Sequence, residues 1–405
     1  MDLTNMNNII SEEEIETAED IRCNPENFEE AVIWGTDWTT ETIFSQLQKG
    51  NIDLNPSFQR RDAWTDREKS KLIESLILGL PVPPIILAEN KNKKNSYIVI
   101  DGKQRLLSIR RFFEENDNGE FAPLKIKSLD ILTDLNGCTY KKAKVKFPEY
   151  IRSIENQTIR TIIIKNWPDE PFLYTVFLRL NTGSKKLSPQ ELRQALKPGE
   201  FLDFLDASTA VSSPVLKMLG NKTADSRMRD IELTLRFYAF YYFIEKYSGN
   251  LKDFLDMTCE ELNKNWDSSK EAFSLLFKRF EEAIEFSFEI MNSDSPFGRY
   301  EGGKCISRFN RAFFELFTYY FIHDEIRSVV RKDSEQFIQL FMEMNEDVDF
   351  VNSISGSTKD IHNLALRFEK FYQLLSSLSS VQECHLSIPH LILDDGKIRV
   401  INALS

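Results

Sequence analysis

Residues 97–105 read YIVIDGKQR and join two different patterns. The apolar run Tyr97–Ile100 predicts a short buried strand, and the leucine-containing run after Arg105 predicts a helix. A helix N-terminus leaves backbone N–H groups unpaired and carries the positive end of the helix dipole. We therefore expect this strand-to-helix junction to attract anions, phosphates in particular.

The side chains of the junction suit that task. Gly102 allows backbone angles closed to other residues, so a ligand can approach closely. Arg105 offers a fork of donors that matches phosphate oxygens, Lys103 is a point charge, and Gln104 both donates and accepts. Asp101 repels bare phosphate, so we expect it to hold a metal ion, orient an arginine or fix the turn. The alternative is an ordinary turn with solvated charges.

A second polar segment lies about forty residues upstream. Residues 58–64, FQRRDAW, place two arginines, a glutamine and a tryptophan just before a predicted helix. Thr65 and Glu68 have the spacing of a capping box, and apolar residues at helical spacing follow from Leu72 to Leu80. Gly79 ends this helix, and residues 83–88 read as a second buried strand.

The succession FQRRDAW (58–64), LIESLILGLPVPPIIL (72–87) and IVIDGKQRLLSI (98–109) resembles the DUF262 family. This family forms the N-terminal domain of GmrSD-type modification-dependent restriction enzymes, and its signature is DGQQR. FLRLNTG (177–183) with LSPQELR (187–193) is similar to a further family segment. The resemblance extends over about residues 35–375 and is strongest in the first half.

The resemblance implies an α+β fold: a ParB/sulfiredoxin-like N-terminal domain followed by a mainly α-helical C-terminal domain. It also implies binding, and in several members hydrolysis, of a nucleoside triphosphate with Mg²⁺. We expect Asp101, Gln104 and Arg105 to be catalytic, and assign no metal ligand. The nucleotide-binding residues expected are Gln59, Arg60, Trp64, Gly102, Lys103, Asn181, Gly183, Glu191 and Arg193.

Four of these positions carry alternatives. Asn181 is otherwise a turn residue, and Arg193 otherwise lies on a solvated helix face. Lys103 stands where the family usually has glutamine; lysine attracts phosphate more strongly but cannot accept a hydrogen bond, so binding is better supported than turnover. Ser188 and Glu191 form a second capping box with Pro189 at the first helical position. Glu191 therefore either caps its helix or positions a metal or water near the nucleotide.

The chain divides into three parts by pattern: an acidic segment 1–34, a DUF262 nucleotide-binding domain 35–198, and a helical domain 199–405 with a short C-terminal hairpin. Residues 144–147 and 158–165 read as further strands of the middle part. Residues 229–247, 269–291 and 306–323 read as long aromatic-rich helices, and residues 385–400 as the hairpin.

Composition narrows the setting. The first twenty residues are polar and acidic, which predicts a cytoplasmic protein without membrane insertion. A net charge of −12 disfavours a broad DNA-binding face. Five scattered cysteines lack metal-ligand spacing. An HNH nuclease needs histidines near a metal, and the four present are dispersed: His323, His362, His385 and His390.

Two classes of function remain. The first is a nucleotide-binding regulator or weak Mg²⁺-dependent NTPase of a bacterial defence system of the restriction type, with its effector on another chain. The second is a non-hydrolysing adaptor for DNA or protein that keeps the fold. The partners implied are an NTP, an effector nuclease or other defence protein, and DNA; the subunit number is left open.

Overall fold

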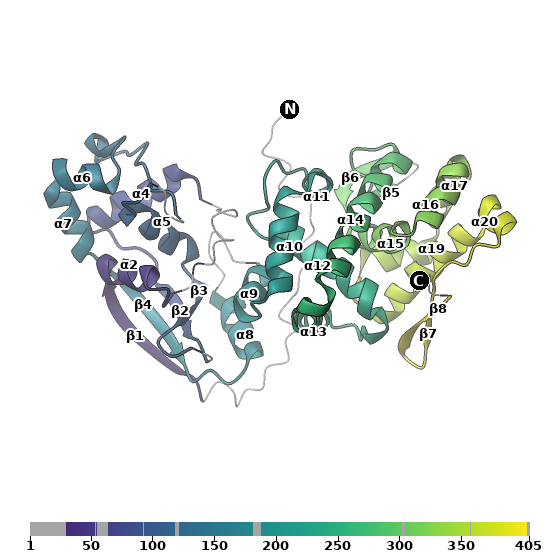
Figure 1. Ribbon diagram of the computed structural model, residues 1–405, viewed down its shortest axis with the longest axis horizontal. Coiled ribbons are helices and arrows are strands. Elements are labelled where there is room, and N and C mark those ends of the chain that lie inside the picture. The colour runs from purple at the N-terminus through teal and green to yellow at the C-terminus, as the bar shows by residue number, and fades with distance from the viewer. Residues whose placement is uncertain are drawn as a thin grey trace. The chain divides into compact units, whose positions relative to one another are not determined.

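The computed structural model describes residues 30–52, 54, 64–91, 93–117, 121–180, 188–301, 304–356 and 358–402 (Figure 1). These residues form two compact units. The N-terminal unit comprises the described residues up to Pro198 together with Ser226–Met228. The C-terminal unit comprises Gly199–Asp225 and the described residues from Arg229 onward.

A four-stranded sheet organises the N-terminal unit. Its strands lie in the order β1-β4-β2-β3, so β1 and β3 form the two edges. β1 pairs antiparallel with β4, β4 pairs parallel with β2, and β2 pairs antiparallel with β3. The strands are β1 (Val32–Thr39), β2 (Ile85–Glu89), β3 (Tyr97–Asp101) and β4 (Thr158–Lys165).

Helices cover both faces of this sheet, because the central strands carry apolar residues that point to both sides. Ile86, Ile100 and Ile164 pack with Leu173 of α8 (Glu170–Leu180) and Leu192 of α9 (Pro189–Leu196). The intervening strand residues, which point to the opposite face, are buried as well. The other helices of this unit are α2 (Thr40–Gln48), α4 (Asp66–Ile77), α5 (Lys103–Phe113), α6 (Tyr140–Lys146) and α7 (Pro148–Asn156).

The helix starts predicted from sequence are confirmed. The Thr65 hydroxyl accepts from the Glu68 N–H while the Glu68 carboxylate accepts from the Thr65 N–H, which completes the capping box of α4. Ser188 and Glu191 make the same reciprocal pair at α9. The strands predicted at residues 83–88, 97–100 and 158–165 are present as β2, β3 and β4.

The strand predicted at residues 144–147 is wrong. Residues up to Lys146 belong to α6, whose buried residues Tyr140 and Ala143 are three positions apart, as one helix face requires. The Tyr140 ring packs against Phe112 and Phe113 of α5, and the lysines between remain exposed. Tertiary packing of one aromatic side chain thus overrides the alternating local pattern.

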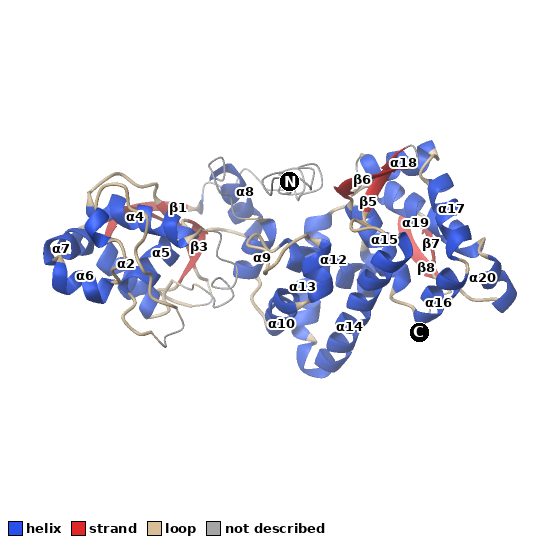
Figure 2. Cartoon of the chain, turned by 90° about the horizontal axis from the view of Figure 1, so that it is seen from above, coloured by secondary structure: helices blue, strands red, loops and turns tan. Residues whose placement is uncertain are grey.

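The C-terminal unit is built mainly of helices (Figure 2). Every residue of α15 (Arg311–Phe321) is buried, which makes it the central helix. Its Phe317 ring packs against Phe341 and Phe371. The helices around it are α10 (Glu200–Val211), α11 (Ser213–Met218), α12 (Arg229–Phe243), α13 (Leu251–Lys264), α14 (Trp266–Met291), α16 (Asp324–Lys332), α17 (Ser334–Met344), α18 (Val348–Ser355), α19 (Ile361–Ser376) and α20 (Ser379–Cys384).

Two hairpins complete this unit. The predicted C-terminal hairpin is present as β7 (His390–Asp394) and β8 (Lys397–Ile401), joined by a turn with positive φ at Asp395 and Gly396. The helix predicted over residues 306–323 is wrong in its first part. Residues 306–309 belong to β6 (Lys304–Phe309), which pairs with β5 (Gly298–Glu301), and the helix begins only after Asn310, whose side chain caps it.

Buried ion pairs join three helices of the C-terminal unit. Glu315 of α15 accepts from Arg236 of α12 at 2.8 Å and from Arg367 of α19 at 2.6 Å. Such pairs fix how helices meet, since losing one partner leaves a charge in the interior.

Among the described residues, no helix is both long enough and apolar enough to cross a lipid bilayer.

Candidate functional site

The turn between β3 and α5 is a close junction of sheet and helix. Asp101 ends β3 and pairs with Ile86 of β2. Gly102 has φ 100° and precedes the first helical residue, Lys103. A Cβ at position 102 would lie 3.1 Å from Cγ1 and 3.3 Å from the Cα of Ile85. Glycine is therefore needed here both for the backbone angle and for the contact with β2.

Arg105 is held across this turn. One terminal nitrogen of its guanidinium donates to Asp101 Oδ2 at 2.9 Å and to the Pro84 carbonyl at 2.9 Å. Its Nε is buried and has no acceptor among the described residues. Asp101 is partly exposed and orients the arginine, one of the three roles that the sequence allowed. A buried N–H donor without an acceptor requires an explanation, such as a water or ligand that the fold is built to receive.

Lys103 points into the interior. Its Nζ donates to Glu191 Oε1 at 2.8 Å, and the two side chains are 4% and 6% exposed. Glu191 Oε2 accepts from the Ser188 N–H at 2.7 Å, so one carboxylate both caps α9 and pairs with α5. Of the two alternatives for Glu191, the geometry therefore shows the cap.

Gln104 and Trp64 meet from segments forty residues apart. Gln104 Oε1 accepts from the Trp64 backbone N–H at 3.3 Å. The Trp64 carbonyl in turn accepts from Nζ of Lys69, a fully buried lysine of α4. Sequence reasoning missed Lys69, although its spacing to Ile73 and Leu76 puts it on the apolar face of the helix. A lysine in that register is a signal of a buried polar contact.

Of the predicted nucleotide-binding residues not yet placed, only Arg193 lies in the described part of the chain. Arg193 is fully buried, and its guanidinium donates to Gln190 Oε1 at 2.7 Å. Gln194, also buried, has no hydrogen-bond partner for either polar atom of its amide within the described part of the chain. The other predicted nucleotide-binding residues lie outside the described residues: Gln59, Arg60, Asn181 and Gly183.

Asp66 forms two salt bridges, one of which joins α4 to α5, the helix that follows the turn. Asp66 at the start of α4 accepts from Arg111 of α5 at 2.9 Å and from Lys127 at 3.2 Å. Partial burial raises the pKa of Asp66, but the two cations outweigh this and hold its pKa below the usual value. The carboxylate is thus charged at neutral pH and fixes α5 against α4.

Metal-binding groups are sparse in the described part of the chain. No set of three or more His, Cys, Asp or Glu side chains gathers there as a ready-made metal cage. A magnesium ion bound together with a triphosphate needs only one or two carboxylates, because phosphate oxygens and water complete its shell. Asp101, partly exposed at the turn, fits that limited requirement.

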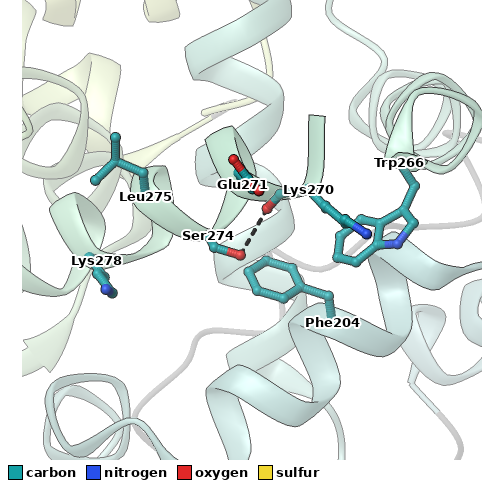
Figure 3. A pocket seen from close by; sticks show the side chains of 7 residues that line it. All are labelled: Phe204, Trp266, Lys270, Glu271, Ser274, Leu275 and Lys278. Atoms are coloured by element: carbon teal, nitrogen blue, oxygen red, sulfur yellow. Dashed lines mark hydrogen bonds between the residues drawn. The ribbon is translucent and has the colours of Figure 1, made fainter. Parts of the chain in front are cut away.

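A surface hollow of about 460 Å³ lies in the C-terminal unit between α10 and α14 (Figure 3). Phe204 and Trp266 form its aromatic wall, with ring centroids 5.4 Å apart. Its other lining residues are exposed and belong to α14: Lys270, Glu271, Ser274, Leu275 and Lys278. This hollow contains a single carboxylate and no nucleophile activated by a neighbouring base, so we do not assign chemistry to it.

Comparison with known proteins identifies one part of the chain. Residues 40–196 match the family model of the GmrSD restriction endonuclease, N-terminal domain. The match includes α4, the β3–α5 turn and α9, and it confirms the resemblance read from the sequence motifs. No curated protein and no solved structure matches the chain.

Proposed function

Because the chain carries a GmrSD N-terminal domain of the DUF262 type at residues 40–196, we propose that this domain binds a nucleoside triphosphate at the β3–α5 turn. In this proposal the domain has the ParB-like fold of its relatives. The chain acts as a nucleotide-dependent regulator or weak NTPase of a restriction-type system, and its effector is on another chain.

The observation that carries the proposal is the donor set at the start of α5. The first backbone hydrogen bond of this helix runs from Leu106 N–H to the Gly102 carbonyl, so the N–H groups of the preceding turn point out of the helix start. No side chain caps this start, whereas α4 and α9 each have a capping box. The guanidinium of Arg105, whose side chain is 13% exposed, adds a charged donor group beside them. Phosphate oxygens bind favourably at such a helix start and to an arginine fork.

Each side chain then has a distinct role. Arg105 binds phosphate, and Asp101 holds the guanidinium in place through the 2.9 Å pair. Asp101 would also hold Mg²⁺, which when bound supplies charge neutralisation for the phosphate oxygens. Gln104 is positioned by the Trp64 N–H and can orient water at the phosphate. Lys103 positions α5 against α9 through Glu191.

The non-hydrolysing adaptor remains the second candidate, and one observation favours it. Lys103, in place of the family glutamine, uses its ammonium on Glu191, and Gln104 uses its amide oxygen on Trp64. Neither group is available as it stands to accept a proton from an attacking water. Under this alternative the site binds nucleotide without turning it over.

Two measurements on the full chain separate these functions. Equilibrium binding of ATP, GTP, CTP and UTP with Mg²⁺ tests the site, and release of inorganic phosphate, with and without DNA, tests hydrolysis. The regulator predicts both; the adaptor predicts binding without phosphate release. Absence of binding for all four nucleotides would contradict both functions.

A control variant guards against contaminating NTPases. Arg160→Ala removes another arginine–aspartate pair of the same unit, to Asp37 on β1, far along the sequence from the turn. It should retain binding and any phosphate release. Arg105→Ala should lose both.

A further inference from the structure

The outer edge of β1 has no partner strand in the part of the chain that the structure describes. Among the described strands β1 pairs only with β4, and it forms one margin of the sheet (Figure 1). An edge strand presents alternate N–H and C=O groups that another strand can bind. Natural edges are usually protected by lysine, proline or a covering helix or loop. β1, with the sequence VIWGTDWT, contains neither lysine nor proline.

Three large apolar residues stand in a row at the start of this edge. Val32, Ile33 and Trp34 are 49%, 72% and 51% exposed. Strand side chains alternate, so both faces of the strand are apolar and solvent-exposed at this point. The one charged residue of β1, Asp37, lies farther along and pairs with Arg160 of β4. An exposed apolar stretch whose own three residues carry no charge is a surface that favours association.

We propose that this edge is a dimerisation surface, where a second copy of the chain adds its own β1 antiparallel through residues 31–35. The occupant follows from the register. A two-fold axis at Ile33 places Ile33 opposite its own copy, Val32 opposite Trp34 of the second copy, and Ala31 opposite Gly35 of the second copy. Large apolar side chains then meet large apolar side chains, and small residues meet small ones.

Other two-fold registers match less well. An axis at Trp34 would place Ile33 opposite Gly35 and Val32 opposite Thr36. An axis between Gly35 and Thr36 would place Trp34 opposite Asp37, which would bury a carboxylate against an indole. Only the register centred on Ile33 pairs all three exposed apolar residues with one another and leaves Asp37 outside. Such self-complementarity is what a two-fold interface requires.

The backbone neighbourhood permits this approach. A terminal nitrogen of Arg160 lies 2.7 Å from where a Cβ at position 35 would stand, so a side chain at this position would displace the guanidinium. The Lys165 ammonium lies 4.5 Å from the centroid of the Trp34 ring and holds the indole on the sheet. Both contacts order the edge before a second copy arrives, which lowers the entropy cost of association.

A charge-swap experiment tests the register directly. Sedimentation equilibrium over a range of concentrations should show a monomer–dimer equilibrium for the unmodified chain. Ile33→Lys and Ile33→Glu each place like charges opposite one another, and each should raise the dimer Kd by about ten-fold or more. An equimolar mixture of the two variants should restore the dimer, since opposite charges then meet at the axis.

Leu275→Lys is the matched control. Leu275 is 60% exposed, similar to Ile33, but it belongs to α14 and should leave the dimer unchanged. At a concentration where the unmodified chain is monomeric, the unfolding midpoints of all variants should match that of the unmodified chain, because position 33 is exposed in the monomer. A monomer at every concentration, a dimer that survives in both Ile33 variants, or a mixture that stays monomeric would each overturn the proposal. The experiment does not depend on nucleotide binding.

Discussion

Lys103 Nζ and Glu191 Oε1 lie 2.8 Å apart in the interior of the N-terminal unit. The side chain of Lys103, the third residue of the DGKQR segment, thus points into the interior of the unit. Its ion pair with Glu191 connects α5 with α9. It also links two of the motifs that resemble the GmrSD family, since Glu191 belongs to the QELR segment. In our account the pair fixes the geometry of the site, while Arg105 contacts the ligand.

Removing the lysine should therefore destabilise the protein. Lys103→Met leaves the Glu191 carboxylate buried without its cation, which typically costs about 3–5 kcal/mol in the free energy of unfolding. Urea unfolding measures this. In a Glu191→Gln background, where the cap acceptor is kept and the charge is gone, the same change should cost much less.

Lys71 is the control for this prediction. It forms a salt bridge of 2.6 Å with Asp130, but the two side chains are 42% and 64% exposed. Lys71→Met should therefore change stability far less than Lys103→Met, because water screens an exposed pair. Equal effects of the two lysine variants would contradict the structural role of Lys103.

Gly102→Ala should reduce both stability and nucleotide binding. A left-handed conformation at a residue with a Cβ costs roughly 1–2 kcal/mol, and here the Cβ also meets the Ile85 backbone at 3.3 Å. Gly137 provides the comparison, since it has φ 85° with no atom within 4 Å of an added Cβ. Gly137→Ala should show the backbone cost alone. A smaller loss for Gly102→Ala than for Gly137→Ala would refute the close contact with β2.

His323 should make the C-terminal unit sensitive to acid. Burial, with the positive charges of Arg279 and Arg327, lowers the pKa of His323 to about 4 from an ordinary 6.5. The unfolded chain then binds a proton that the folded chain does not, so stability is full above pH 6.5 and falls as the pH drops toward 4. At about 1.4 kcal/mol per pH unit the loss is about 3 kcal/mol.

The variant His323→Gln cannot take up this proton. Its unfolding free energy should depend less on pH in that window than the free energy of the unmodified chain. His362, which is exposed, is the control: His362→Gln should keep the original pH dependence. An unaltered pH dependence in His323→Gln would show that other groups cause the acid sensitivity.

Local signals predicted the centre of the site. The strand, glycine turn and helix at residues 97–113 follow from the sequence because apolar pattern and turn chemistry agree there. The capping boxes of α4 and α9 follow for the same reason, since each depends on residues three positions apart. The Asp101–Arg105 pair, four residues apart on one helix start, belongs to this local class.

Contacts between residues far apart in the chain could not be predicted from the sequence. Lys103 and Glu191 are 88 residues apart, and no pattern in either segment specifies the other as its partner. The same holds for Gln104 with Trp64 and for Arg105 with the Pro84 carbonyl. β1 was not predicted, because Trp34, Gly35 and Asp37 interrupt its alternation and its partner β4 lies far along the chain. The helical state of α6 was not predicted either, because it depends on the packing of Tyr140 against α5.

The central claim is that Arg105 binds phosphate at the β3–α5 turn. Isothermal titration calorimetry with the best-bound NTP and Mg²⁺ tests it in the unmodified chain, in Arg105→Ala and in the Arg160→Ala control. Charge-assisted hydrogen bonds contribute about 1.5–3 kcal/mol each, so Arg105→Ala should weaken binding by about ten-fold or more while Arg160→Ala binds normally. Unchanged affinity in a folded Arg105→Ala variant would contradict the account.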